Sequence, residues 1–276
     1  MEQVLKTMLE NVRAKSPLVH NITNYVTVND VANVLLAAGG SPIMSDDADD
    51  VEDITSICGG LNINIGTLNK NTIPSMFLAG KKANALGHIV LLDPVGAGAS
   101  RLRTDTANRL MQEVRFDAVR GNISEIKTLC TGSGSTKGVD ADAVDAVTEA
   151  NLDNGVQLVK TFAAQTGCII AVTGAIDLVS DGARCWCIRN GRAEMSRITG
   201  TGCQLSALMT AFLVANPDRK LDAAAAAVCM MGLAGEIGWA NMQPGDGNRT
   251  YRNRIIDAIF NMTGDALEEG AKYELR

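Results

Sequence analysis

The sequence predicts an α/β fold in which helices cover both faces of a mostly parallel central sheet. Short apolar runs that end in glycine or polar residues alternate with longer segments of helical periodicity. Residues 89–92 are continuously apolar, as is typical of a strand buried on both faces of a parallel sheet. Asp181-Gly182 and Asn190-Gly191 each follow a short apolar run and predict two successive hairpins. We therefore expect late antiparallel strands beside an otherwise parallel sheet.

Length and composition are typical of one large cytoplasmic domain. The 276 residues can bury a substantial core, and no internal repeat or linker divides 1–276. The net charge of −6, without a basic stripe, argues against a nucleic-acid partner. The seven cysteines lack paired metal spacing, and Cys185-x-Cys187 is too tight for a zinc pair, so it is expected on one face of a strand. The N-terminus contains no apolar run of signal length, so neither secretion nor membrane insertion is expected.

The expected elements can be placed in chain order from periodicity and turn residues. Helices are expected over 2–14, 28–38, a segment with Met76, Leu78 and Ala79, from 123 onward, over roughly 141–165, from the turn at 198–203 to 216, over 221–240, and around 255–260 as the last core helix. Strands are expected at 41–44, 61–65, 89–92, 117–120, 168–172, 177–180 and 183–188, and a surface loop at 132–138. Gly235 and Gly238 lie inside a predicted helix, so close packing or a ligand is expected there.

The turn Gly200-Thr201-Gly202-Cys203 precedes the most strongly patterned helix of the chain. Its glycines allow backbone N–H groups to converge where the helix dipole is positive, which favours an anion. The cysteine lies where a helix N-terminus typically lowers the thiol pKa. The alternative is an ordinary tight turn with a small buried cysteine. Neither the dinucleotide fingerprint nor the P-loop pattern fits this turn, so the turn taken alone favours the second alternative, and the case for an anion site must come from the rest of the chain.

Three other places carry candidate functional groups. In residues 20–27, amide and hydroxyl side chains alternate with apolar ones; they either start the helix at 28 as caps or orient an uncharged ligand. Asp93 ends a predicted central strand, where α/β sheets bind their ligands. Asn122 and Glu125 have the spacing of a capping box, but Glu125 would also lie beside Asp93 as a second carboxylate for a metal.

Five short motifs together resemble the hydroxyethylthiazole kinases, a family of the ribokinase-like superfamily that acts in thiamine salvage. They are Asn21-Ile22-Thr23-Asn24, Asp93-Pro94-Val95-Gly96, Arg120-Gly121-Asn122 with Glu125, Val172-Thr173-Gly174, and Gly200-Thr201-Gly202-Cys203. Each motif is weak alone, but their order over essentially the whole chain is specific. The resemblance implies a three-layer ribokinase-like fold, and a homotrimer with active sites between subunits.

The resemblance also implies a reaction, the phosphorylation by ATP of the hydroxyl of 4-methyl-5-(2-hydroxyethyl)thiazole, with Mg²⁺. By position, Arg120 and Thr173 are expected to contact ATP, Asn24 and Met44 to contact the thiazole, and Asp93 and Glu125 to hold magnesium. Gly200 and Gly202 are expected to bind the transferred phosphoryl group. Cys203 replaces the aspartate that usually acts as base in this superfamily, as it does in the thiazole kinases.

The resemblance leaves rival functions on the same fold. A hydroxymethylpyrimidine or pyridoxal kinase, and the lyase ATP-dependent NAD(P)H-hydrate dehydratase, normally keep the aspartate that Cys203 replaces. A binding module without catalysis would leave the phosphate and metal features unused. The neutral groups around Asn24 suit a small uncharged acceptor, as phosphoryl transfer to an alcohol requires.

Overall fold

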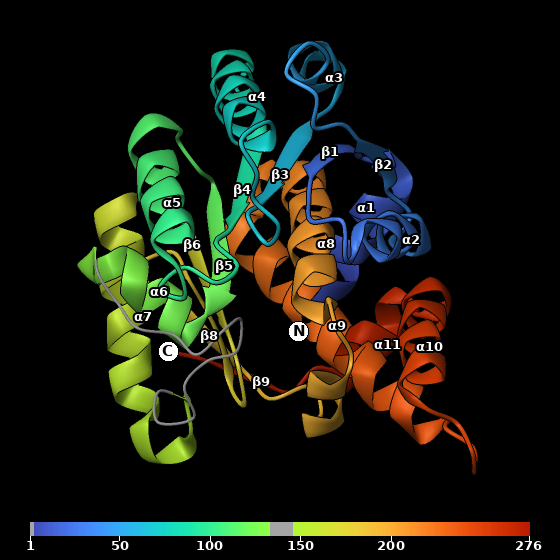
Figure 1. The fold of residues 1–276 in the computed structure, drawn as a ribbon. Helices are drawn as coiled ribbons and strands as arrows, with labels where there is room; N and C mark the ends of the chain where they lie inside the picture. The colour runs from blue at the N-terminus through green and yellow to red at the C-terminus, as the bar shows by residue number, and fades with distance from the viewer. Residues whose placement is uncertain (1–2, 133–145) are drawn as a thin grey trace.

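The computed structural model describes residues 3–132 and 146–276 (Figure 1). The helices are α1 (Val4–Lys15), α2 (Val28–Ala38), α3 (Val51–Ile57), α4 (Thr72–Leu86), α5 (Arg101–Glu113), α6 (Ile123–Thr131), α7 (Leu152–Thr166), α8 (Thr201–Ala215), α9 (Lys220–Ala240), α10 (Asn248–Asn261) and α11 (Gly264–Gly270). The strands are β1 (Leu18–Ile22), β2 (Ser41–Met44), β3 (Gly60–Asn64), β4 (Ile89–Asp93), β5 (Ala118–Asn122), β6 (Ile169–Thr173), β7 (Asp177–Ser180), β8 (Cys185–Ile188) and β9 (Tyr273–Leu275). Short 3₁₀ helices lie at Glu149–Asn151, Ala193–Arg197 and Pro217–Arg219.

The strands form one nine-stranded sheet in the order β2-β1-β3-β4-β5-β6-β7-β8-β9. Neighbours from β2 to β6 are parallel, and those from β6 to β9 are antiparallel. Helices α3 to α7 cover one face, and α1, α2 and α8 to α11 cover the other (Figure 1). The predicted fold class, three layers around a mostly parallel sheet with late antiparallel strands, is confirmed.

Strand β4 illustrates why its sequence forms a central strand. Its side chains alternate between the two faces, so Ile89 and Leu91 join the core beneath α8 and α9, while Val90 and Leu92 join the core beneath α4 and α5. All of its residues are buried, which explains the continuous apolar run. The same alternation places the last residue, Asp93, on the α8 face.

Helix α8 is buried on all sides rather than along a single apolar face. Residues 203–213 are buried throughout, because α2 and α9 flank the helix and the sheet lies beneath it. Helix α9 follows as a second core helix. The segment Pro217–Ala240 has the length and apolar character of a membrane span, but 78% of its apolar window is buried inside the structure, as in a core helix. Gly235 and Gly238 allow close contact with Met195 and Ile255, as predicted.

The sequence prediction was wrong at several elements. Residues 18–22 form strand β1 within the segment taken as the approach to α2. The turn signal at Asn190-Gly191 does not form a hairpin, because β8 pairs instead with the C-terminal strand β9 and residues 193–197 form a 3₁₀ helix. The helix around 255–260 starts at 248. It is not the last core helix, because α11 follows with Leu267 fully buried.

Two further expectations concern residues 132–165. Residues 146–148 are not helical, and α7 begins only at Leu152 after a 3₁₀ turn, so the helix expected from about 141 starts later than predicted. Residues 141–145 of that expected helix, and residues 133–138 of the expected loop, lie outside the described residues. Cys185 and Cys187 do share one face of β8 and point into the core, and all seven cysteines are free thiols.

Candidate active site

Polar side chains gather on the α8 face of the sheet, at the carboxyl ends of its central parallel strands. Because side chains alternate along a strand, Asn64 on β3, Asp93 on β4, and Arg120 on β5 all point to this face. Thr173 on β6 joins them, and its hydroxyl accepts a hydrogen bond of 2.5 Å from Arg120 Nη2. The carboxyl edge of a parallel sheet is where α/β proteins bind ligands.

The start of α8 closes over these groups through two glycines. Gly200 has a φ of 87°, in the left-handed region that favours glycine, and it packs directly against Thr27. Gly202 lies against the guanidinium of Arg120, and a Cβ at this position would collide with its Nη1. The turn thus brings the positive end of the α8 dipole next to a partly buried cation, which makes the region attractive to a phosphate.

Asp93 is fully buried beside this cation. Its Oδ2 accepts hydrogen bonds from Asn64 Nδ2 at 2.7 Å and from Ser206 Oγ at 2.8 Å. Its Oδ1 has no hydrogen-bond partner among the described residues and lies 3.7 Å from Arg120 Nη1. Burial raises the pKa of Asp93, and the charge of Arg120 opposes this shift.

Glu125 forms the capping box that its spacing predicts. Its Oε2 accepts a hydrogen bond from the Asn122 amide at 2.8 Å, while Asn122 Oδ1 accepts one from the Glu125 amide at 2.9 Å. Its Oε1 also accepts a bond of 2.7 Å from the Gly96 amide, in the loop after β4. Burial and then the nearby charge of Asp93 raise the pKa of Glu125 to about 7. Glu125 therefore caps α6 and is also a neighbour of Asp93.

A magnesium ion fits this pair of carboxylates. Asp93 Oδ1 is a buried oxygen whose hydrogen-bonding capacity is unused by the described residues, whereas each oxygen of Glu125 already accepts a backbone N–H. In residues 3–132 and 146–276, no group of three His, Cys, Asp or Glu side chains is arranged to hold a metal. Mg²⁺ suits such a sparse site, because it keeps several waters and needs only one or two carboxylates together with substrate phosphates.

Cys203 lies in the first turn of α8, opposite Asn24. Asn24 Nδ2 donates a hydrogen bond to Cys203 Sγ at 3.2 Å. Burial and the charge of Asp93 raise the pKa of the Cys203 thiol, although Arg120 and the Asn24 amide oppose the shift. The lowered pKa expected from the helix N-terminus is therefore wrong, because burial and a neighbouring carboxylate outweigh the helix dipole.

Asn24 bonds to the thiol, and Met44 packs against the apolar cluster that includes Cys203. Asn24 Oδ1 accepts hydrogen bonds from the backbone N and the Oγ1 of Thr27, at 3.2 and 3.0 Å, so Asn24 also fixes the chain at the start of α2. This bond to the Thr27 amide agrees with the capping alternative for the segment, and the role in orienting a ligand stays a prediction. Met44, at the end of β2, packs against the cluster that contains Cys203.

Sequence reasoning missed Asn64 and Ser206. Both are buried and contact Asp93, and Asn64 also contacts Asn24 through a bond of 3.0 Å from Asn24 Nδ2 to Asn64 Oδ1. The position of Asn64 at the carboxyl end of a buried strand was the available signal. Ser206 carried none, because a serine within a helix usually bonds only to its own backbone.

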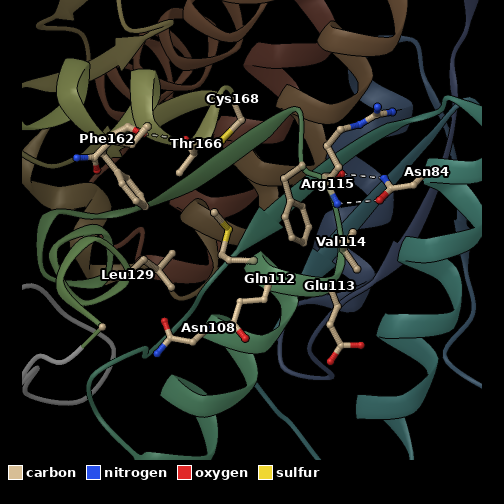
Figure 2. Close-up of a pocket in the computed structure, with 14 residues that line it drawn as sticks. Asn84, Asn108, Gln112, Glu113, Val114, Arg115, Leu129, Phe162, Thr166 and Cys168 are labelled. Carbon is tan, nitrogen blue, oxygen red and sulfur yellow. Dashed lines mark hydrogen bonds between the residues drawn. The ribbon is translucent and has the colours of Figure 1, made fainter.

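A separate cavity of about 820 Å³ lies at the opposite edge of the sheet. Figure 2 shows Phe162, Leu129 and Gln112 around it, together with Asn84, whose amide pairs with both backbone polar groups of Arg115. These residues come from the ends of α4 to α7 and the segments before β5 and β6, at the amino edge. The cavity contains none of the predicted site residues.

Comparison with known proteins agrees with the motifs. Residues 9–265 match the model of the hydroxyethylthiazole kinase family. A hydroxyethylthiazole kinase from Clostridium acetobutylicum is 58% identical, over 98% of this chain and 99% of the relative. The structure of the hydroxyethylthiazole kinase protein from Pyrococcus horikoshii superposes with a TM-score of 0.87 at 32% identity, over 99% of this chain and 98% of that one.

Structural similarity to a more distant protein concerns the fold alone. The pyridoxal kinase from Staphylococcus aureus, solved with AMP-PCP and pyridoxal, superposes with a TM-score of 0.61 at 14% identity, over 94% of this chain and 98% of that one. At such low identity the likeness shows a common ribokinase-like fold and nothing about substrate. The family match and the identity to the Clostridium relative are far more specific. The chain belongs to the hydroxyethylthiazole kinase family.

Proposed function

We propose that the protein transfers the γ-phosphoryl group of ATP to the hydroxyl of 4-methyl-5-(2-hydroxyethyl)thiazole, as a step of thiamine salvage. The observation that carries this proposal is the convergence of three groups on the start of α8. Arg120 packs against Gly202, and Asp93 Oδ1, which accepts no hydrogen bond from the described residues, lies 3.7 Å from the same guanidinium. A cation, a carboxylate for magnesium and a helix N-terminus are what a transferring phosphoryl group requires.

Each predicted site residue has a role in this proposal. Arg120 and Thr173, already joined by a hydrogen bond, contact the ATP phosphates from β5 and β6. Asn24, which bonds to Cys203, and Met44, which packs against the cluster that contains it, contact the thiazole. The backbone N–H groups of the turn 200–203 form the anion hole. When bound, magnesium neutralises charge on the phosphates, and Asp93 and Glu125 would hold it mainly through water.

The chemical step then needs positioning more than covalent chemistry. The alcohol oxygen forms a bond to the γ-phosphorus while the bond from that phosphorus to the β–γ bridging oxygen breaks, and ADP leaves. The alcohol proton must be accepted as the new ester forms. Cys203 is the proposed acceptor, because its sulfur faces Asn24 at the thiazole side of the turn.

The acceptor is tested by measuring ATP consumption with four substrates: the thiazole alcohol, the pyrimidine alcohol, pyridoxal and hydrated NADH. We expect the thiazole alcohol to give the highest kcat/KM, because Asn24 and Met44 present neutral groups to a small uncharged ring. Faster turnover on the pyrimidine alcohol would overturn the proposed acceptor. ATP-dependent dehydration of hydrated NADH would instead favour the lyase.

Cys203 as base makes a prediction for two variants. Cys203→Ala should reduce kcat by about tenfold to a hundredfold, near or below the low end of general-base effects, because a loose transition state requires little proton transfer until late. ATP affinity should change little, and Cys203→Asp should retain or exceed the parental rate. Because burial and Asp93 raise the thiol pKa, the parent is mostly thiol at neutral pH, and its kcat should increase as the pH rises.

The measurement is kcat against pH for the parent and both variants. Gln157→Ala, an exposed substitution on α7, is the control for handling and should follow the parental profile. If Cys203→Ala keeps the parental rate and pH profile, the cysteine only packs, and the anion hole and magnesium perform the catalysis.

We also propose that the chain acts as a homotrimer in the cytoplasm, with the active site shared between subunits. Tyr25 and Val26 are 78% and 56% exposed next to Asn24, and Leu36 on α2 is 57% exposed. Apolar side chains so exposed beside a ligand-binding amide suit a neighbouring subunit that completes the pocket. Light scattering should therefore give a trimer, and a fully active monomer would contradict the shared site.

A further inference from the structure

Asn64 uses both ends of its side-chain amide to join two parts of the candidate site. It is 1% exposed at the end of β3. Its Nδ2 donates to Asp93 Oδ2 at 2.7 Å, and its Oδ1 accepts from Asn24 Nδ2 at 3.0 Å and from the Gly66 amide at 2.9 Å.

The orientation of this amide follows from its partners. A backbone N–H can only donate, so the atom of Asn64 that faces Gly66 must be the oxygen. With the oxygen facing Gly66, the nitrogen faces Asp93 and donates to its Oδ2. A flipped amide would place donor against donor and acceptor against acceptor. The surroundings therefore allow one arrangement of the Asn64 side chain.

On the carboxylate side, Asn64 helps to determine which oxygen of Asp93 is available. Asn64 and Ser206 both bond to Oδ2 and so fix the plane of the carboxylate. The remaining oxygen, Oδ1, lies 3.7 Å from Arg120 Nη1 and has no hydrogen-bond partner among residues 3–132 and 146–276. Oδ1 is therefore the oxygen left to receive a cation or a water bound to it.

On the amide side, Asn64 helps to hold Asn24 in place. The backbone N–H of Thr27 donates to Asn24 Oδ1, so the Asn24 nitrogen must face the other way. There it donates to Asn64 Oδ1 at 3.0 Å and to Cys203 Sγ at 3.2 Å. Without the Asn64 oxygen, Asn24 Nδ2 would lose one of the two partners that hold it at the thiol.

We propose that Asn64 is a positioning residue that aligns both the Asp93 carboxylate, on the magnesium side, and the Asn24 amide, on the thiazole side. This inference rests on the proposed function, because the two sides are the magnesium and thiazole sides only in a thiazole kinase. Asn64 itself need not touch either substrate. Its removal should weaken both ligands at once, which a residue serving only one side would not do.

The test replaces Asn64 with leucine, which has a similar size but no hydrogen-bonding group. Two affinities are measured without turnover: that of the thiazole alcohol by calorimetry in the absence of nucleotide, and that of Mn²⁺ by electron paramagnetic resonance in the presence of ADP. We expect each to weaken by about tenfold, as befits the loss of one buried hydrogen bond on each side. Asn64→Ser, which keeps a hydroxyl, should lie between the parent and Asn64→Leu in both affinities.

Two controls separate positioning from loss of stability. Asn62→Leu changes a fully buried asparagine two residues earlier on the same strand and face, whose amide donates to Asn21 Oδ1 at 3.1 Å rather than to Asp93. It should lower the Tm but leave both affinities within about twofold of the parent. Ser206→Ala removes the hydrogen bonds to Asp93 and to the Gly202 carbonyl but none to Asn24, so it should weaken Mn²⁺ and leave the thiazole alcohol unchanged.

The outcomes are distinct. If Asn64→Leu, or Asn64→Ser should the leucine variant not fold, lowers the Tm but changes neither affinity, Asn64 is only a structural residue and the inference is wrong. If only one affinity changes, the alignment of both sides is wrong. If the parent itself does not bind the thiazole alcohol, the proposed function fails, and the Mn²⁺ measurement still decides whether Asn64 positions Asp93.

Discussion

Gly202→Ala is expected to reduce kcat/KM by about a hundredfold to a thousandfold, the effect of losing one preorganised electrostatic contact to a transferring group. A Cβ at Gly202 would collide with the Arg120 guanidinium, which is the mobile end of a long side chain. The fold can therefore accommodate the methyl group by moving Arg120, away from Thr173 and Asp93. The Tm should change little, while the site loses the cation from its position beside the anion hole.

The matched control is Gly247→Ala, because a Cβ at Gly247 meets no atom within 4 Å. This variant should keep the parental kcat/KM. A double variant distinguishes the two ways in which Gly202→Ala could act. If Gly202→Ala acts through Arg120, adding it to Arg120→Ala should cause little further loss, since both changes remove the same interaction. Fully additive losses would mean that the methyl group blocks the anion hole directly.

The double variant Asp93→Asn, Glu125→Gln should need at least about tenfold more magnesium for half-maximal rate. The substitutions remove both carboxylate charges while keeping the side-chain sizes, and Mg²⁺ usually depends on one or two such charges. A large fall in kcat at saturating magnesium should accompany the change, because charge on the transferring phosphates is then poorly neutralised. The measurement is initial rate against magnesium concentration at fixed ATP.

The single variants assign the two carboxylates. Glu113→Gln on α5 is the control, because its carboxylate forms surface ion pairs with Lys81 and Arg109 and lies at the amino edge of the sheet, opposite the candidate site. Its magnesium requirement should be that of the parent. If Glu125→Gln lowers the Tm but leaves the requirement unchanged, the role of Glu125 is limited to the capping box.

Local sequence patterns predicted much of the fold, and they failed where contacts with distant segments determine the structure. The continuous apolar run of β4 and the capping box at Asn122 depend on neighbours in sequence, and both were found. Strand β9 has only Tyr273–Leu275, and it pairs with β8, far earlier in the chain. Asn190-Gly191 was misread as a hairpin because nothing local shows that the edge of β8 is already paired.

The candidate site shows the same contrast between local patterns and distant contacts. Order of motifs identified Asp93, Arg120 and Cys203, and the structure brings them together at the start of α8. The pKa of Cys203 could not be predicted from its place in a helix, because the dominant influences are burial and a carboxylate on another element. Asn64 was missed for a similar reason, since its importance lies in partners on two other segments, Asn24 and Asp93.

Product stoichiometry tests the central claim most directly. The enzyme is incubated with ATP, magnesium and the thiazole alcohol, and ADP, inorganic phosphate and the phosphorylated thiazole are quantified together by ³¹P NMR and mass spectrometry. Direct transfer between the groups around Gly202 predicts one phosphorylated thiazole for each ADP, with the phosphate on the hydroxyethyl oxygen. ADP formed together with inorganic phosphate, and without the phosphorylated thiazole, would contradict the account.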